Sequence, residues 1–144
     1  MKTKGPLIAR WILGLIFFVF GLNGFFNFIP MPETMPEKMA TFMGGLMASQ
    51  YFFPLLMGSE VVCGALLLIG AFVPLALIVL APIIINIFLT HAFLDSSGLP
   101  MVIFIGLLEI YLAFFAQPYS AIVKQIFRCP MKEKISSKSA NERT

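Results

Sequence analysis

Four long apolar stretches alternate along the chain with short segments that contain proline, glycine or charged residues. A helix needs about 20 consecutive apolar residues to cross the hydrocarbon core of a bilayer. Each stretch is close to this length, so the pattern predicts four membrane-spanning helices. The predicted spans cover about residues 7–29, 51–72, 74–94 and 99–117.

The longest polar interruption, residues 30–51, lies between the first and second spans. Its prolines break any helix that continues from the preceding span. Within it, residues 37–49 place apolar side chains on one side of a short helix, namely Met39, Phe42, Met43 and Leu46. This spacing predicts an amphipathic helix that lies at the membrane interface or caps the bundle.

The later connections are short. Val73 and Pro74 alone join the second and third spans, which predicts a tight antiparallel hairpin. Pro82 is expected to bend the third span without ending it. Residues 95–98, Asp-Ser-Ser-Gly, have the composition of a turn.

The pattern divides the chain into a transmembrane domain, residues 1–128, and a C-terminal tail, residues 129–144. Residues 119–128 are expected to form a juxtamembrane helix at the end of the domain. The tail is rich in Ser and Lys, a composition that cannot bury enough apolar surface to fold, so it is predicted to be disordered.

Composition supports a membrane location. Hydrophobic residues make up 59% of the 144-residue chain and charged residues only 12%, whereas soluble domains carry about 25% charged residues. A domain of this length cannot bury so much apolar surface in a core of its own. We therefore expect an all-α integral membrane four-helix bundle, and not a soluble enzyme.

The positive charges lie at the two ends of the chain. Nine of the ten Lys and Arg residues are terminal: Lys2, Lys4, Arg10, Lys124, Arg128, Lys132, Lys134, Lys138 and Arg143. Positive residues stay on the cytoplasmic side of the membrane during insertion, which predicts that both termini are cytoplasmic. A basic run just after a span is typical of a topology anchor that contacts anionic lipid, and we do not expect nucleic-acid binding.

Polar residues inside the spans are the candidates for chemistry. At a helix rise of about 1.5 Å per residue, Glu60 and Asn86 lie about 12 Å and Glu109 about 15 Å below the outer boundary. Asn23 and His91 lie nearer the outer surface. A carboxylate at mid-bilayer costs several kcal/mol unless it is protonated, paired or hydrated. These five residues therefore predict a polar layer between the helices.

Helical spacing predicts which way the glutamates face. Glu60 shares a face with Gly64, and Glu109 shares a face with Gly106 and Ala113. Small residues mark the faces on which membrane helices pack closely. Both glutamates are therefore expected to point toward partner helices and not toward lipid. His91 is expected to face the adjoining loop or a neighbouring subunit.

These residues allow several kinds of chemistry. Two buried carboxyls with nearby amides could bind a proton, a cation or the polar head of a lipid-like molecule such as a quinone. A protonated glutamate bonded to an asparagine would instead be a structural clasp between helices. Arg10 is expected to be a lipid and topology anchor at the cytoplasmic boundary. The single His and the distant Cys63 and Cys129 predict no metal site.

The sequence resembles the DoxX family of small bacterial membrane proteins over about residues 7–117. The resemblance is carried by the Asp95-x-x-Gly98 turn, the glycines after Glu60, and an ordered polar set: Arg10, Asn23, Glu60, Asn86 and His91. It implies a four-helix bundle in the bacterial inner membrane. The family is named after a subunit associated with a thiosulfate:quinone oxidoreductase, and some members are linked to redox-stress complexes.

Three functions remain open at this point. The leading one is an accessory subunit that binds quinone or lipid through Glu60, Asn86, Glu109, Asn23 and His91. The second is a quinone-linked oxidoreductase subunit whose electrons come from redox partner proteins. The third is a small proton-coupled transporter that acts as a homo-oligomer, since four helices form a narrow bundle. No catalytic motif is recognisable in the chain.

Overall fold

The computed structural model describes residues 4–30 and 34–127, and these residues form helices joined by short connections. The elements are α1 (Gly5–Phe26), α2 (Glu37–Ala48), α3 (Phe52–Ile69), α4 (Val73–Phe93), η1 (Ser96–Gly98), α5 (Leu99–Ile110), η2 (Tyr111–Phe115) and α6 (Tyr119–Ile126). The tail over 129–144, predicted to be disordered, lies outside the described residues. No strand occurs within the described ranges.

Four of these helical segments are long and apolar enough to cross a membrane: α1, α3, α4 and the continuous stretch from η1 through η2. The prediction of an all-α membrane protein with four spans is confirmed. The first span ends earlier than predicted because Asn27 adopts a left-handed conformation, with φ 49°. The second ends at Ile69 because Gly70, with φ 80°, caps the helix.

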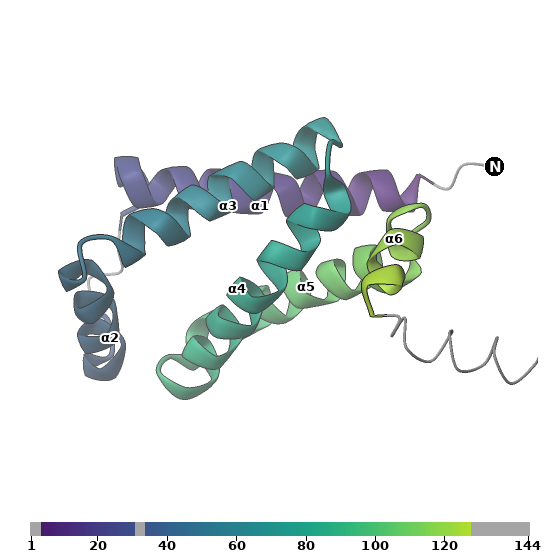
Figure 1. The fold of residues 1–144 in the computed structure, drawn as a ribbon. Coiled ribbons are helices and arrows are strands. Elements are labelled where there is room, and N and C mark those ends of the chain that lie inside the picture. The colour runs from purple at the N-terminus through teal and green to yellow at the C-terminus, as the bar shows by residue number, and fades with distance from the viewer. Residues whose placement is uncertain (1–3, 31–33, 128–144) are drawn as a thin grey trace, which may run out of the picture.

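The spans form two antiparallel pairs, α1 with α3 and α4 with α5 (Figure 1). The predicted tight hairpin of the second and third spans is wrong in its packing. The turn between α3 and α4 is indeed short, but the two helices spread apart from it, and each packs along a different partner. The physical reason is the close fit between α1 and α3.

Glycines bring α1 and α3 into close contact. A Cβ atom added to Gly64 would lie 2.8 Å from Cα of Phe18 and 2.9 Å from the carbonyl oxygen of Gly14. A Cβ atom added to Gly14 would lie 2.9 Å from Cβ of Leu67. Lipid tails are as apolar as the helix side chains, so the hydrophobic effect does not drive helices together in a membrane. Van der Waals attraction between closely packed backbones supplies the driving force instead. Glycine, whose side chain is a single hydrogen, therefore allows α1 and α3 to pack this closely.

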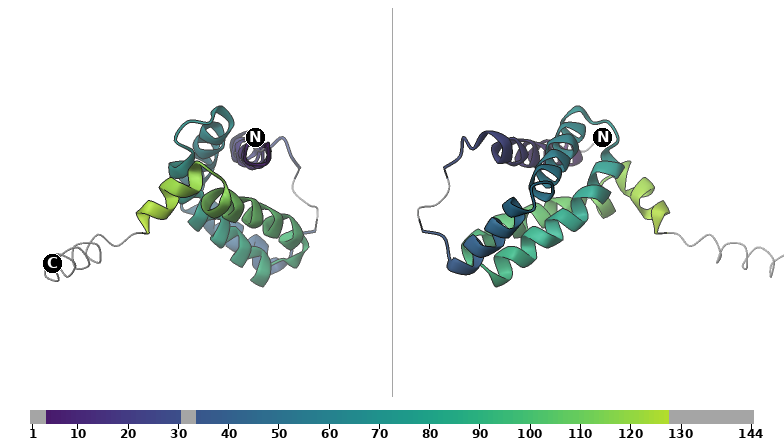
Figure 2. Two further views of the ribbon diagram at one scale, coloured as in Figure 1. Left: turned by 90° about the vertical axis from the view of Figure 1, so that its right-hand side faces the viewer. Right: turned by 60° about the vertical axis from the view of Figure 1, so that its left-hand side comes forward.

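The core is concentrated where the two pairs meet, near the turn between α3 and α4. The fully buried side chains there include Leu13 of α1, Leu67 of α3, Leu77 and Leu80 of α4, and Leu112 of η2. The beginning of α1 and the whole of α6 lie at this same end of the molecule, and α6 lies beside the beginning of α4 (Figure 2). This placement agrees with an even number of membrane crossings.

The opposite end holds α2 and η1 (Figure 1). α2 has no buried residue and packs mainly against α3. The apolar side predicted for it, which contains Phe42 and Leu46, is only half-buried. Of the two alternatives, an interfacial helix fits this placement better than a cap over the bundle.

We predict that Gly64→Ala destabilises the protein and that Gly58→Ala does not. The new methyl group at residue 64 would force α1 and α3 apart, at a cost of about 1–3 kcal/mol. At Gly58, on the same helix, no described atom lies within 4 Å of an added Cβ. Thermal unfolding in detergent measures both variants, and equal melting temperatures would show that the glycine contact does not hold the pair together.

Candidate functional site

The two glutamates within the spans are both buried in the core. Glu60 of α3 is 4% exposed and Glu109 of α5 is 6% exposed. Both lie within electrostatic range of the Cys63 thiol on α3. The prediction that both carboxyls face inward is confirmed by this burial. The structure thus brings one acidic side chain from each helix pair toward the same region.

The α-helix that carries Glu109 ends at the next residue, and the chain continues as the π-helix η2. η2 is a π-helix, in which the N–H of Ala116 donates to the carbonyl of Tyr111 at 2.9 Å. Widened turns of this kind occur in helices frequently at functional sites. The sequence carried no signal for this change, because the residues around it are ordinary apolar helix formers.

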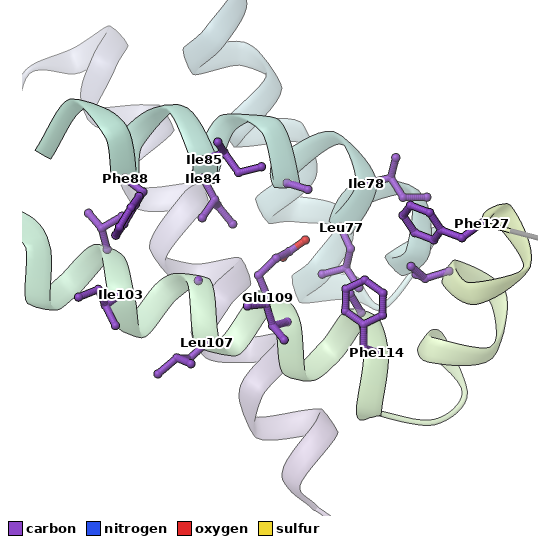
Figure 3. A pocket seen from close by; sticks show the side chains of 16 residues that line it. Leu77, Ile78, Ile84, Ile85, Phe88, Ile103, Leu107, Glu109, Phe114 and Phe127 are labelled. Atoms are coloured by element: carbon purple, nitrogen blue, oxygen red, sulfur yellow. The ribbon is translucent and has the colours of Figure 1, made fainter. Parts of the chain in front are cut away.

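A groove of about 580 Å³ lies between α4 and α5 and is bounded at one end by α6 (Figure 3). Its walls are aliphatic and aromatic side chains, including Ile84 and Phe88 of α4 and Phe114 of η2. Several of the lining residues, such as Ile85 and Leu107, are exposed at the surface of the helix pair. In a membrane that surface contacts lipid, so the groove opens to the bilayer.

Glu109 is the only polar side chain among the described residues that line the groove. Its carboxyl points between the two helices toward α4 (Figure 3). The Oε2 atom is buried and has no hydrogen-bond partner among the described residues. Leaving a buried polar atom unpaired costs about 1–3 kcal/mol, so the carboxyl is suited to receive a partner from a bound molecule.

Asn86 does not belong with the glutamates, contrary to prediction. It is exposed on α4, and the described hydrogen bonds of its carbonyl and side chain come from Thr90, at 2.9 Å and 3.5 Å. It lies about 200° round the helix from the buried Ile84, at about 100° per residue. The alternative of a structural clasp, a hydrogen bond between a glutamate and an asparagine, is therefore absent among the described residues.

Asn23 and His91 are also separate from the glutamates, and each serves its own helix end. The Oδ1 atom of Asn23 accepts the N–H of Ile29 at 2.6 Å, beyond the end of α1. Nδ1 of His91 lies 2.9 Å from the carbonyl oxygen of Ile87, and its ring packs against Gly98. The prediction that His91 faces the loop is confirmed. The predicted five-residue layer is reduced to two carboxyls.

The turn between α4 and α5 holds a charged group. The backbone N–H of Ser97 donates to Oδ1 of Asp95 at 3.0 Å. Hydrogen bonds from Ser97 hold the pKa of Asp95 below its usual value. Because a carboxylate is costly inside the hydrocarbon core, this turn is expected to lie at the membrane surface.

Arg10 lies against Gly70, at the C-terminal end of α3, where an added Cβ would collide with its guanidinium. A cation at this position interacts favourably with the negative end of the helix dipole. Arg10 therefore has a structural contact within the protein. Its predicted role as a lipid and topology anchor stays a prediction.

Within residues 4–30 and 34–127, no group of three or more His, Cys, Asp and Glu side chains is arranged to hold a metal ion. A family model with the description DoxX matches residues 5–92 of the chain. No curated protein and no solved structure matches it. The matched region runs from α1 nearly to the end of α4 and includes Glu60, whereas Glu109 and η2 lie beyond it.

The two asparagines are expected to respond differently to truncation. Asn23→Ala removes the acceptor of the Ile29 N–H and should lower the free energy of unfolding by about 1 kcal/mol. Asn86→Ala, at an exposed position, should leave it unchanged within about 0.5 kcal/mol. Denaturant titration of the purified variants checks both values. A larger loss of unfolding free energy for Asn86→Ala would show that Asn86 does contribute to the core.

Proposed function

Because the chain belongs to the DoxX family of membrane proteins, we propose that it is an accessory subunit that holds a quinone or a similar lipid-like molecule between α4 and α5. The observation that carries this function is the apolar groove with the single unpartnered carboxyl of Glu109. The chain is a multi-pass membrane protein, and we place it in the bacterial inner membrane.

The size and wall of the groove suit such a ligand. Sites for small molecules usually measure about 300–1,000 Å³ and have apolar walls with few polar groups. The groove lies within this range. An isoprenoid chain would lie along the aliphatic side chains of α4 and α5, and the polar ring would be oriented by the Glu109 carboxyl.

Depth in the membrane limits the class of ligand further. Glu109 lies about 15 Å along the helix from Leu99, at a rise of about 1.5 Å per residue. A hydrocarbon core is about 30 Å thick, so this carboxyl lies near its middle. The charged head of a phospholipid stays at the interface. A ligand that reaches Glu109 therefore needs a small polar group on a largely apolar body.

We propose an accessory role because the four spans contain no pair of thiols that could carry electrons. Cys63 is the one thiol in the four spans, and a single thiol is not a dithiol pair. In this function, electrons reach the quinone from a redox partner protein. The subunit itself holds the quinone at mid-bilayer depth, where the partner exchanges electrons with it.

Native mass spectrometry of the protein, extracted gently from its own membrane, tests this function. A Cβ at Gly106 would lie 3.9 Å from Cγ2 of Ile84, so Gly106→Leu should be tolerated while its side chain fills the groove. We expect the wild type to retain quinone and Gly106→Leu to retain about tenfold less, since overpacking by one side chain costs roughly 1.4 kcal/mol of binding.

Gly58→Leu is the matched control, because it adds the same side chain to a span at a position with open space around it. It should retain quinone as the wild type does. Wild-type protein that carries only bulk phospholipid, or equal quinone in all three proteins, would contradict the proposed function.

A further inference from the structure

The groove contains one acidic side chain, Glu109, and no basic side chain lies beside it among the described residues. Arg10 of α1 is directed to Gly70, and Lys124 of α6 is exposed and absent from the groove wall. His91, on α4, packs against the turn at the other end of that helix. The Glu109 carboxyl therefore has no described cation beside it.

The remaining titratable groups around Glu109 are acidic or neutral. α3 contributes Glu60 and Cys63, which lie toward the same region of the core. The hydroxyl of Tyr111 lies beside Gly5, and Tyr119 of α6 packs against the hydrophobic core. Two buried carboxyls and no described base make this part of the protein favourable for a positive charge.

The walls of the groove also favour a cation that carries its own apolar surface. Phe88, Phe114 and Phe127 line it (Figure 3), and aromatic rings attract cations through their negative faces. A metal cation would have to exchange its water shell for several oxygen ligands. The described groove offers one carboxyl, so an inorganic ion does not fit and a lipophilic organic cation does.

We propose that the groove binds lipophilic organic cations in exchange for the proton of Glu109. An ionised carboxylate at mid-bilayer depth is costly without a partner, so Glu109 holds its proton when the groove contains no cation. When the cation binds, the O–H bond of the carboxyl breaks and the proton is released to water. One positive charge replaces another, and no oxidant or reductant is needed.

This inference goes beyond the proposed function and rests on the charge of the groove rather than on quinone binding. The two can fail separately. Cation binding without retained quinone would remove the accessory quinone role alone, whereas retained quinone without cation binding would remove the exchange alone.

Isothermal titration of the purified full-length protein with tetraphenylphosphonium tests the exchange between about pH 5 and pH 9. A lower pH protonates Glu109 and removes the binding form, so affinity should fall by about tenfold per pH unit on the acidic side. It should level off at high pH. On the acidic side, repeating the titration in buffers of different ionisation enthalpy should show about one proton released for each cation bound, and on the high-pH plateau none.

Tetraphenylborate, which has the same shape and the opposite charge, separates charge from hydrophobicity in the wild-type protein. Titrated alone into the protein, without the phosphonium ion, it should not bind in the groove. Equally tight binding of the anion, pH-independent binding of the cation, or cation binding without proton release at acidic pH would each overturn the exchange. These results need no variant, so they hold even if a substitution disturbs folding.

Two carboxyl-to-amide variants assign the exchange to one residue. Glu109→Gln should lose the pH dependence and bind at least about tenfold more weakly at high pH, because one close charge attraction is removed. Glu60→Gln changes a carboxyl outside the groove wall, so its affinity at high pH should fall by only about threefold, less than for Glu109→Gln, and remain pH-dependent, because charge attraction weakens with distance. The reverse result would overturn the assignment to Glu109. Circular dichroism of both variants is the control that their helices are kept.

Discussion

Gly14 and Gly64 let the backbones of α1 and α3 approach to van der Waals distance, and the positions of the other helices depend on this contact. In lipid, close packing replaces the hydrophobic effect as the force that joins helices. Once α3 lies along α1, α4 leaves the turn in another direction and packs along α5. The groove lies within this second pair, where larger side chains keep the two helices farther apart.

The membrane also determines what the groove can do. An ionised carboxylate without a partner is costly at the estimated depth of Glu109, so its carboxyl is neutralised by a proton or by a ligand. Here the unpaired atom gives the groove a preference for molecules that bring a hydrogen-bond donor or a positive charge to an otherwise apolar wall.

The number of spans and the inward direction of Glu60 and Glu109 were predictable, because length, apolarity and the helical period determine them. The pairing of helices was not, since apolar helices resemble one another and glycine contacts depend on three-dimensional fit. The direction in which Asn86 points from α4 was also unpredictable, because α4 is apolar all round and has no polar face to set its rotation. Asn23, four residues before the left-handed Asn27, could have been recognised as part of a helix end.

The most direct test of the account is carboxyl labelling in intact membranes, followed by peptide mass spectrometry. Dicyclohexylcarbodiimide dissolves in lipid and reacts with protonated carboxyls, whereas a water-soluble carbodiimide does not enter the bilayer. If the groove opens to lipid as described, the lipophilic reagent should modify Glu109 and leave Glu60 unmodified, and the water-soluble reagent should modify neither. Modification of Glu60 instead, or protection of both glutamates from the lipophilic reagent, would contradict a groove that gives the bilayer access to Glu109.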